Sequence, residues 1–198
     1  MPAPPDRCQV LPGRVAGRPL CIWALLFWLC FLLAPPHAQA QGVELALLKT
    51  SRAEGSLNLH FAARVSLPRA AEDALMRGVP IYFVAEATLL RGRWYWRDER
   101  VARVSRSWRV AFQPLTSTWR VSLAGLNQSY ASLNEALTAA SRSAGWRLAD
   151  LSQLDPDRAY YVEFSYRLDS TQLPGPMQFG LGGGDWAVGV SRDLRVEP

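Results

Sequence analysis

The stretch Tyr160-Tyr-Val-Glu-Phe-Ser-Tyr-Arg-Leu168 alternates apolar and polar side chains residue by residue. This period of two is typical of a β-strand with one face in a core and the other in water. Outward along the chain, the same alternation recurs at Leu57–Val65, at Val104–Phe112, where Arg106 interrupts the apolar face, and at Trp119–Leu123. Four such stripes favour antiparallel sheets that cover a core on one side.

A fifth stretch, Ile81–Leu90, is apolar on both faces apart from Glu86 and Thr88, which predicts a central strand covered on both sides. Arginine is abundant in the chain, so we expect Glu86 to form a structural ion pair within that strand. The segment from Gln113 to Ser117 is short and contains a proline, so the strands on either side of it are predicted to form a hairpin.

Two helices interrupt the strands. The first, Pro68–Arg77, begins with a proline suited to an initial helical turn and ends before a glycine. The second, Ala131–Ala144, begins with a capping box formed by Ser132 and Glu135, and Gly145 is its predicted stop. The predicted fold is therefore mainly β, an antiparallel β-sandwich-like domain with two short helices.

The first forty residues have the pattern of a secretory signal peptide. Three arginines precede an uncharged apolar run, Leu20–Ala34, which is followed by two prolines and by the small residues of Ala38-Gln39-Ala40. We expect cleavage after Ala40, which leaves residues 41–198 as a single periplasmic domain. The alternative is an inner-membrane anchor formed by residues 20–34, but these fifteen residues are fewer than the roughly 20 that cross a bilayer core.

Cleavage at that position changes the chemistry available to the protein. It removes all three cysteines, so the remaining 158 residues form no disulfide and depend on burial for their stability. They carry 19 basic and 16 acidic side chains, a net charge of +3 in place of the +5 of the whole chain. Export and this weak, dispersed charge exclude a nucleic-acid partner.

Three motifs follow one another along the chain: Gln113-Pro-Leu-Thr-Ser-Thr-Trp-Arg-Val121, Tyr130-Ala-Ser-Leu-Asn-Glu-Ala-Leu137 and Arg167-Leu-Asp-Ser-Thr-Gln-Leu-Pro-Gly-Pro176. With the proline-rich leader and the late Trp186, they resemble the bacterial proline-rich signal-peptide proteins, a domain of unknown function numbered 4390. The resemblance implies an exported envelope protein of Gram-negative bacteria. It implies no activity, cofactor or catalytic residue.

Residues suited to catalysis or metal binding are sparse after position 40. The single histidine there, His60, lies on the polar side of its strand, and no motif supplies the serine and acid of a triad. One histidine without a thiolate does not suit zinc, and we expect no metal, cofactor or catalytic residue. Carboxylates are more plentiful, so a cell-wall glycan hydrolase or lyase that uses Glu86 and Asp98 is the alternative.

The segment Arg91-Gly-Arg-Trp-Tyr-Trp-Arg-Asp-Glu-Arg100 is the most distinctive candidate for an interaction surface. On a strand, Trp94 and Trp96 share one face, which we expect to be buried, although exposed tryptophans would form a platform for a sugar or a protein. The opposite face is basic and aromatic and suits an acidic protein, a glycan or a lipid headgroup. This candidate surface consists of Arg91, Arg93, Tyr95 and Arg97.

A second candidate is the proline-containing segment Leu173-Pro174-Gly175-Pro176, which is either a docking segment or a stiff crossover between strands, the interpretation we favour. Taken together, the sequence predicts an exported, non-enzymatic binding or accessory module. Its expected partner is an envelope protein or a cell-wall component, and it meets a membrane only through an uncleaved leader.

Overall fold

A computed structural model describes residues 42–93, 97–172 and 186–197 of the chain. The predicted leader, the Trp94-Tyr95-Trp96 triplet and the Leu173–Pro176 segment lie outside the described residues. Within them, neighbouring strands pair antiparallel throughout, and they form two sheets with the orders β1-β2-β7 and β6-β5-β4-β3-β8-β9. The strands are β1 Val43–Ala53, β2 Ser56–Val65, β3 Ile81–Arg91, β4 Glu99–Gln113, β5 Thr118–Leu123, β6 Leu126–Tyr130, β7 Arg142–Asp150, β8 Tyr160–Leu168 and β9 Gly189–Arg195.

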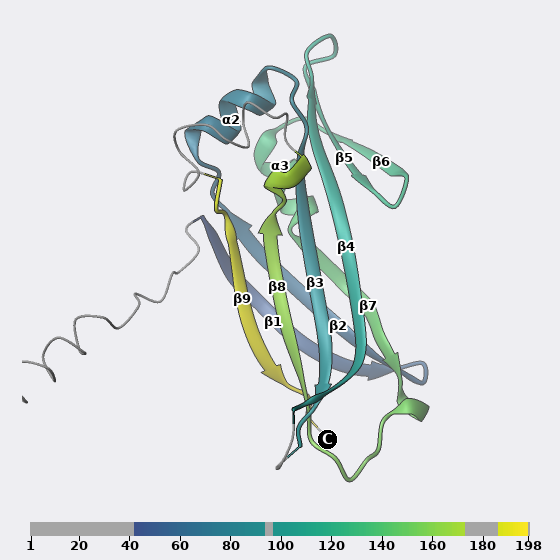
Figure 1. Cartoon of the computed structure of the whole chain (residues 1–198). Coiled ribbons are helices and arrows are strands. Elements are labelled where there is room, and N and C mark those ends of the chain that lie inside the picture. Colours follow the sequence, from purple (N-terminus) through teal and green to yellow (C-terminus); the bar gives the residue numbers. More distant parts are fainter. Residues whose placement is uncertain (1–41, 94–96, 173–185, 198) are drawn as a thin grey trace, which may run out of the picture. The chain divides into compact units, whose positions relative to one another are not determined.

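The two sheets face each other, with the three-stranded sheet behind β9, β8 and β3 in the view of Figure 1. Their facing sides carry the apolar stripes that the sequence predicts. On β8 every apolar residue of the 160–168 stripe is buried, and on β2 the same holds for Leu57, Leu59, Phe61 and Ala63. The mainly-β, sandwich-like architecture with two helices is therefore confirmed.

An aromatic cluster joins the sheets at the centre of the core. Phe61 on β2 lies 4.9 Å, ring centre to ring centre, from Phe164 and 5.7 Å from Tyr166, both on β8. It also meets Trp108 of β4 at 5.9 Å and Trp146 of β7 at 6.3 Å. One side chain of the smaller sheet thus contacts rings from three other strands, two of them in the opposite sheet.

The central strand β3 departs from its prediction in one respect. It lies between β4 and β8, as a central strand should, but its burial alternates from Ile81 to Leu89, and the register shift at Leu89 and Leu90 breaks the alternation. Ile81, Phe83 and Leu89 are fully buried, whereas Glu86 and Thr88 lie on a half-exposed outer face. Within the described residues, the expectation that this strand is covered on both sides was wrong, because Val84, Glu86 and Thr88 on its outer face stay partly exposed.

The first helix, α2 (Arg69–Met76), matches its prediction, with Pro68 at the N-cap and Gly78 beyond its end at φ 84°. The second, α3 (Leu133–Ala140), is shorter than predicted. Its capping box is present, with the Glu135 N–H donating to Ser132 Oγ at 3.2 Å and the Ala131 N–H donating to the Glu135 carboxylate at 3.2 Å. The helix ends at Ser141, and the next residue begins β7.

Gly145 is consequently not a helix stop. It lies inside β7 at φ 62°, where the pairing with β2 shifts between Leu59 and Phe61. This is the geometry of a β-bulge, for which a glycine with positive φ is well suited. None of the helices in the described part of the chain combines the length and the apolar character needed to span a membrane.

The N-cap of α3 gives a prediction for stability. Replacing Ser132 with Ala removes the acceptor for the Glu135 N–H, and we expect the free energy of unfolding to fall by about 1 kcal/mol. The exposed Ser129→Ala on β6 is the matched control and should change it by less than about 0.5 kcal/mol. Urea denaturation of both variants tests this, and equal values for the two would contradict it.

Candidate functional site

The connection between β3 and β4 holds the arginines that the sequence singles out. Arg91 ends β3 and lies opposite Glu99, which begins β4. The Arg91 Nε–H donates to Glu99 Oε2 at 3.1 Å, and the guanidinium of Arg93 pairs with the same oxygen. The hydrogen bond from Arg91 is the main reason why the pKa of Glu99 is lowered. Two of the predicted surface arginines thus share one carboxylate within the chain.

For the described residues of this segment, the prediction that it continues as a strand was wrong. Gly92, Arg93, Arg97 and Asp98 belong to no strand, so β3 ends at Arg91 and β4 begins at Glu99. The pairing of β3 with β4 ends at Arg91 and Glu99, so the described residues beyond this pair leave the sheet. Arg97 is exposed in this loop and has no ion-pair partner among the described residues.

Asp98 fixes the base of the loop to β8. Its carboxylate accepts hydrogen bonds from the Tyr161 hydroxyl and, at 3.1 Å, from the Arg93 backbone N–H. The bond from Tyr161 is the larger cause of a lowered Asp98 pKa, and the same bond is the main cause that raises the pKa of Tyr161 to about 12. Asp98 is therefore ionised at neutral pH, and the phenol is held as a donor.

This pair gives a pH prediction. Because the Asp98 pKa is lowered by folding, its contribution to stability is present above the ordinary aspartate pKa and is lost as the pH falls through the lowered value. Asp98→Asn should move the pKa of Tyr161 from about 12 toward its ordinary value of 10.0. Carbon-13 NMR of tyrosine labelled at Cζ measures the shift. Asp157→Asn, which leaves this hydrogen bond in place, should not move it, and an unmoved pKa in Asp98→Asn would contradict the assignment.

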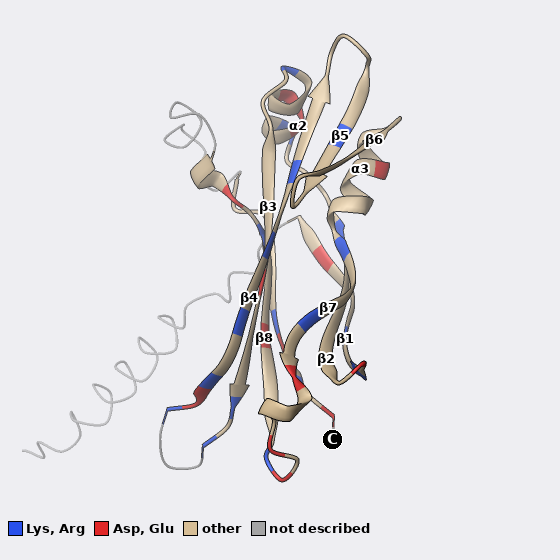
Figure 2. Cartoon of the chain, turned by 90° about the vertical axis from the view of Figure 1, so that its right-hand side faces the viewer, with Lys and Arg blue, Asp and Glu red and all other residues tan. Residues whose placement is uncertain are grey.

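A polar hollow of about 530 Å³ lies beside this pair, on the outer face of the six-stranded sheet. Strand register explains its composition, because Thr88 of β3 lies opposite Arg103 of β4 on one side and Glu163 of β8 on the other. Figure 2 shows the basic residues that recur along β4 toward this end of the sheet. The lining residues are Glu86, Thr88, Leu90, Arg97, Asp98, Arg100, Arg103, Tyr161 and Glu163.

Glu86 forms the arginine pair that the sequence predicts. Its Oε1 lies 2.5 Å from Nη2 of Arg103, which is on β4 and lies opposite Thr88 of β3. The pair lies on the open face of the sheet, since the Glu86 side chain is 24% exposed and that of Arg103 54%. Arg100, next in the hollow, has no ion-pair partner among the described residues, so two guanidinium groups, those of Arg97 and Arg100, remain available to a ligand.

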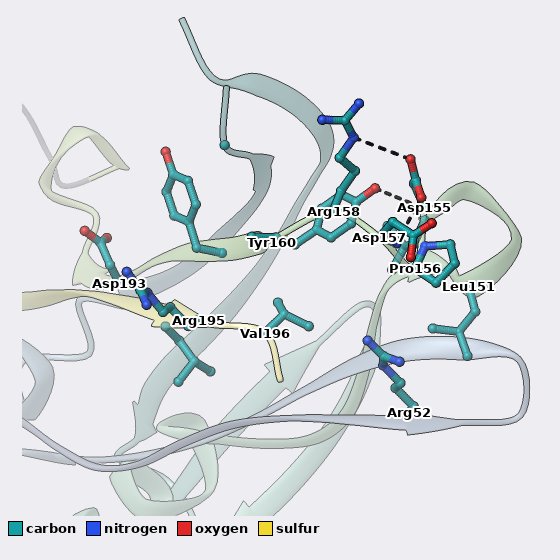
Figure 3. A pocket seen from close by; sticks show the side chains of 15 residues that line it. Arg52, Leu151, Asp155, Pro156, Asp157, Arg158, Tyr160, Asp193, Arg195 and Val196 are labelled. Atoms are coloured by element: carbon teal, nitrogen blue, oxygen red, sulfur yellow. Dashed lines mark hydrogen bonds and ion pairs between the residues drawn. The ribbon is translucent and has the colours of Figure 1, made fainter. Parts of the chain in front are cut away.

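A larger hollow of about 1110 Å³ opens at the same end of the domain, and Tyr161 lines both hollows. Figure 3 shows its walls: the end of β1 with Arg52, the 151–159 segment that follows β7, and the end of β9. The Asp155 carboxylate accepts from the Asp157 N–H at 3.0 Å and lies 3.6 Å from Arg158 Nε, so this segment is held by its own contacts.

The chain matches one known family over most of its length. Residues 40–194 match the family model described as a domain of unknown function, DUF4390. The chain belongs to the DUF4390 family. No curated protein and no solved structure matched it.

His60 has a structural place in this DUF4390 domain. Its Nδ1 accepts from the Gly145 N–H at 3.2 Å, and its Nε2 lies 2.7 Å from Ser51 Oγ. A neutral imidazole with an accepting Nδ1 carries its proton on Nε2, which therefore donates to the serine. A base that activates a serine needs the reverse arrangement. His60 links the three strands of its sheet, with Ser51 on β1 and Gly145 on β7.

Among residues 42–93, 97–172 and 186–197 of the DUF4390 chain, no three histidine, cysteine or carboxylate side chains gather as a metal site would require. Sequence reasoning named three residues that line the polar hollow, namely Glu86, Arg97 and Asp98, whereas the predicted Arg91 and Arg93 are not in its lining. It missed the larger hollow and Tyr161, because their walls come from strand ends that are far apart in the sequence.

Proposed function

We propose that this protein is an exported envelope protein whose domain, residues 41–198, acts as a non-catalytic binding or accessory module. In this proposal the partner is an envelope protein or a cell-wall component, and it binds at the polar hollow. The observation that carries the proposal is the pair of unpartnered guanidinium groups, Arg97 and Arg100, beside the fixed carboxylates Glu86 and Asp98 in the described part of the chain.

The chemistry of the hollow supports a polar partner that offers both acceptors and donors. Guanidinium groups without an internal acid bind carboxylates with charge-assisted hydrogen bonds, and these bonds are stronger than neutral ones. Glu163 and Asp98 supply acceptors on the same face. Cell-wall peptides and acidic protein segments carry both kinds of group.

A double charge reversal tests the proposed surface. Arg97→Glu with Arg100→Glu should lower retention on purified sacculi, or capture of the envelope partner by the tagged chain, by at least about tenfold, because two charge-assisted bonds are lost. Arg142→Glu, exposed on β7 and away from the hollow, is the matched control and should bind normally. Thermal unfolding verifies the fold of both variants. Undiminished binding by the double variant would refute this surface.

Export is the second part of the proposal, and the family match supports it, because that match begins at residue 40, where we expect cleavage. The leader also carries seven of the 14 prolines, which fits the proline-rich signal-peptide description. In a Gram-negative host, we expect the periplasmic fraction to contain a chain whose N-terminal sequence begins at Gln41. A chain that stays with the inner membrane and keeps its first forty residues would support the anchor formed by residues 20–34 instead.

The alternative, an acid-dependent glycan hydrolase or lyase, has one observation in its favour: Glu86 and Asp98 line the same hollow. Against it, a general acid needs a raised pKa, whereas the pKa of Asp98 is lowered and Glu86 is paired with Arg103. A binding module should release no soluble muropeptides from sacculi at any pH tested. Release that stops in Glu86→Gln would establish the alternative.

A further inference from the structure

The larger hollow has an apolar floor formed by the open end of the core. Leu151 and Leu154 come from the segment after β7, while Leu194 and Val196 come from the end of β9, and all four are half-buried against the core. Leu194 lies opposite Val162 on β8, which is fully buried, so Leu194 also faces inward. A hollow of about 1110 Å³ is large enough for a small apolar ligand.

One charged side chain enters this apolar space from the inner face of a sheet. Arg52 on β1 lies opposite Leu57 on β2, and Leu57 is fully buried between the sheets. Directly opposed residues of an antiparallel pair share a face, so Arg52 lies on the inner side of its sheet, at the exposed open end of the space between the sheets. Figure 3 shows its guanidinium group between Val196 and Leu151.

The charge of Arg52 has no acid beside it among the described residues. Its Nη2 donates to the backbone carbonyl of Glu197 at 3.1 Å, and no carboxylate within the described ranges pairs with it. Asp155, Asp157 and Asp193 also line the hollow, but none of them pairs with Arg52 within the described ranges. Asp193 is on the outer face of β9, opposite Glu163, and Asp155 is engaged by Arg158 and by the N–H of Asp157.

We infer that this hollow binds an anionic amphiphile, a molecule with a single apolar chain that ends in a carboxylate or a phosphate. The chain lies on Leu151, Leu154, Leu194 and Val196, and the anionic end is held by the guanidinium of Arg52. Arg195 also lines the hollow but lies on the outer face of β9 with Asp193, so Arg52 is the donor of this site. This site shares Tyr161 with the polar hollow but does not depend on the function proposed for that hollow.

Direct binding of matched probes to the purified chain tests the inference. Isothermal titration should detect laurate and dodecyl phosphate below their micelle concentrations, and dodecyltrimethylammonium, with the same chain and the opposite charge, should bind at least about tenfold more weakly. The ratio of the two anions distinguishes a carboxylate site from a phosphate site. Equal binding of the cation, or no binding of either anion, would overturn the inference.

Two substitutions identify the site. Arg52→Gln should weaken laurate binding about tenfold, the size expected when one charge-assisted hydrogen bond is lost, and Arg52→Lys should weaken it less because the charge is kept. Arg64→Gln, exposed on the neighbouring strand β2, is the matched control and should bind laurate normally. Unaltered laurate binding in Arg52→Gln would place the anion elsewhere and refute the assignment.

Two further measurements distinguish this site from the polar hollow and from a peptide groove. The Arg97→Glu, Arg100→Glu variant should bind laurate like the unchanged protein, so failure of the proposed function and failure of this inference are distinguishable. A short peptide that ends in leucine should bind more weakly than laurate. If that peptide bound and laurate did not, the hollow would be a peptide groove, and the inference that it binds an anionic amphiphile would be refuted.

Discussion

Phe61→Ala is expected to lower the free energy of unfolding by about 3–5 kcal/mol, the range for removal of a buried phenylalanine side chain. Phe61 is 2% exposed and contacts the rings of Trp108, Trp146, Phe164 and Tyr166. The cavity left behind would lie between the two sheets, where neighbouring rings are fixed by their own strands and cannot fill it. Urea denaturation followed by tryptophan fluorescence measures the loss.

Leu115→Ala is the matched control for this experiment, because Leu115 is fully exposed in the turn between β4 and β5. We expect its effect to stay within about 0.5 kcal/mol. If Phe61→Ala cost no more than this control, the aromatic cluster would not be what holds the smaller sheet against the larger one.

Gly189→Ala is expected to lower the free energy of unfolding by about 1–3 kcal/mol, as overpacking does in a closely fitted interior. Gly189 begins β9 and is buried opposite Arg167. A Cβ at this position would lie 2.8 Å from Arg167 Cβ and 3.0 Å from the carbonyl oxygen of Tyr166. Both neighbours belong to the backbone region of β8, so β9 itself must move away.

The control is Gly92→Ala, because a Cβ on Gly92 meets no atom within 4 Å. Its free energy of unfolding should stay within about 0.5 kcal/mol of the unchanged protein, as for other open surface positions. Leu194 on the displaced strand lines the larger hollow, so Gly189→Ala should also weaken laurate binding. Equal stability of the two variants would contradict the close approach of β8 and β9.

Much of the fold follows from the sequence, because strands with one buried face alternate visibly. This holds for β2, β5 and β8, whose inward residues are apolar without a break. The edge strands β6 and β9 were missed, since their residues are mostly exposed and form no apolar stripe. In β1 the register shifts between Leu45 and Leu47, which breaks the period of two. In β7 the bulge at Gly145 also breaks the period of two. Because glycine commonly ends a helix, Gly145 was predicted to be a helix stop and the strand was missed.

The candidate site was predictable only in part. The pairing of Glu86 with an arginine followed from the cost of an isolated charge on a sheet and the abundance of arginine, and the structure confirms it through Arg103. The sharing of Glu99 by Arg91 and Arg93 was not foreseen, because it depends on where the hairpin turns. The inward orientation of Arg52 depends on the register between β1 and β2, which periodicity does not specify.

The pairing of β2 with β7 has a consequence for how the chain reaches its native state. The hairpin of β1 and β2 is complete at Val65. The strand that pairs with β2, β7, begins only at Arg142, and β8, which carries the Phe164 ring against Phe61, begins only at Tyr160. During synthesis from the N-terminus, nearly a hundred further residues must be made before β8 can cover the apolar face of the β1–β2 hairpin. Contacts so distant in sequence slow folding, so the early hairpin is the stage at which a chaperone would be most useful.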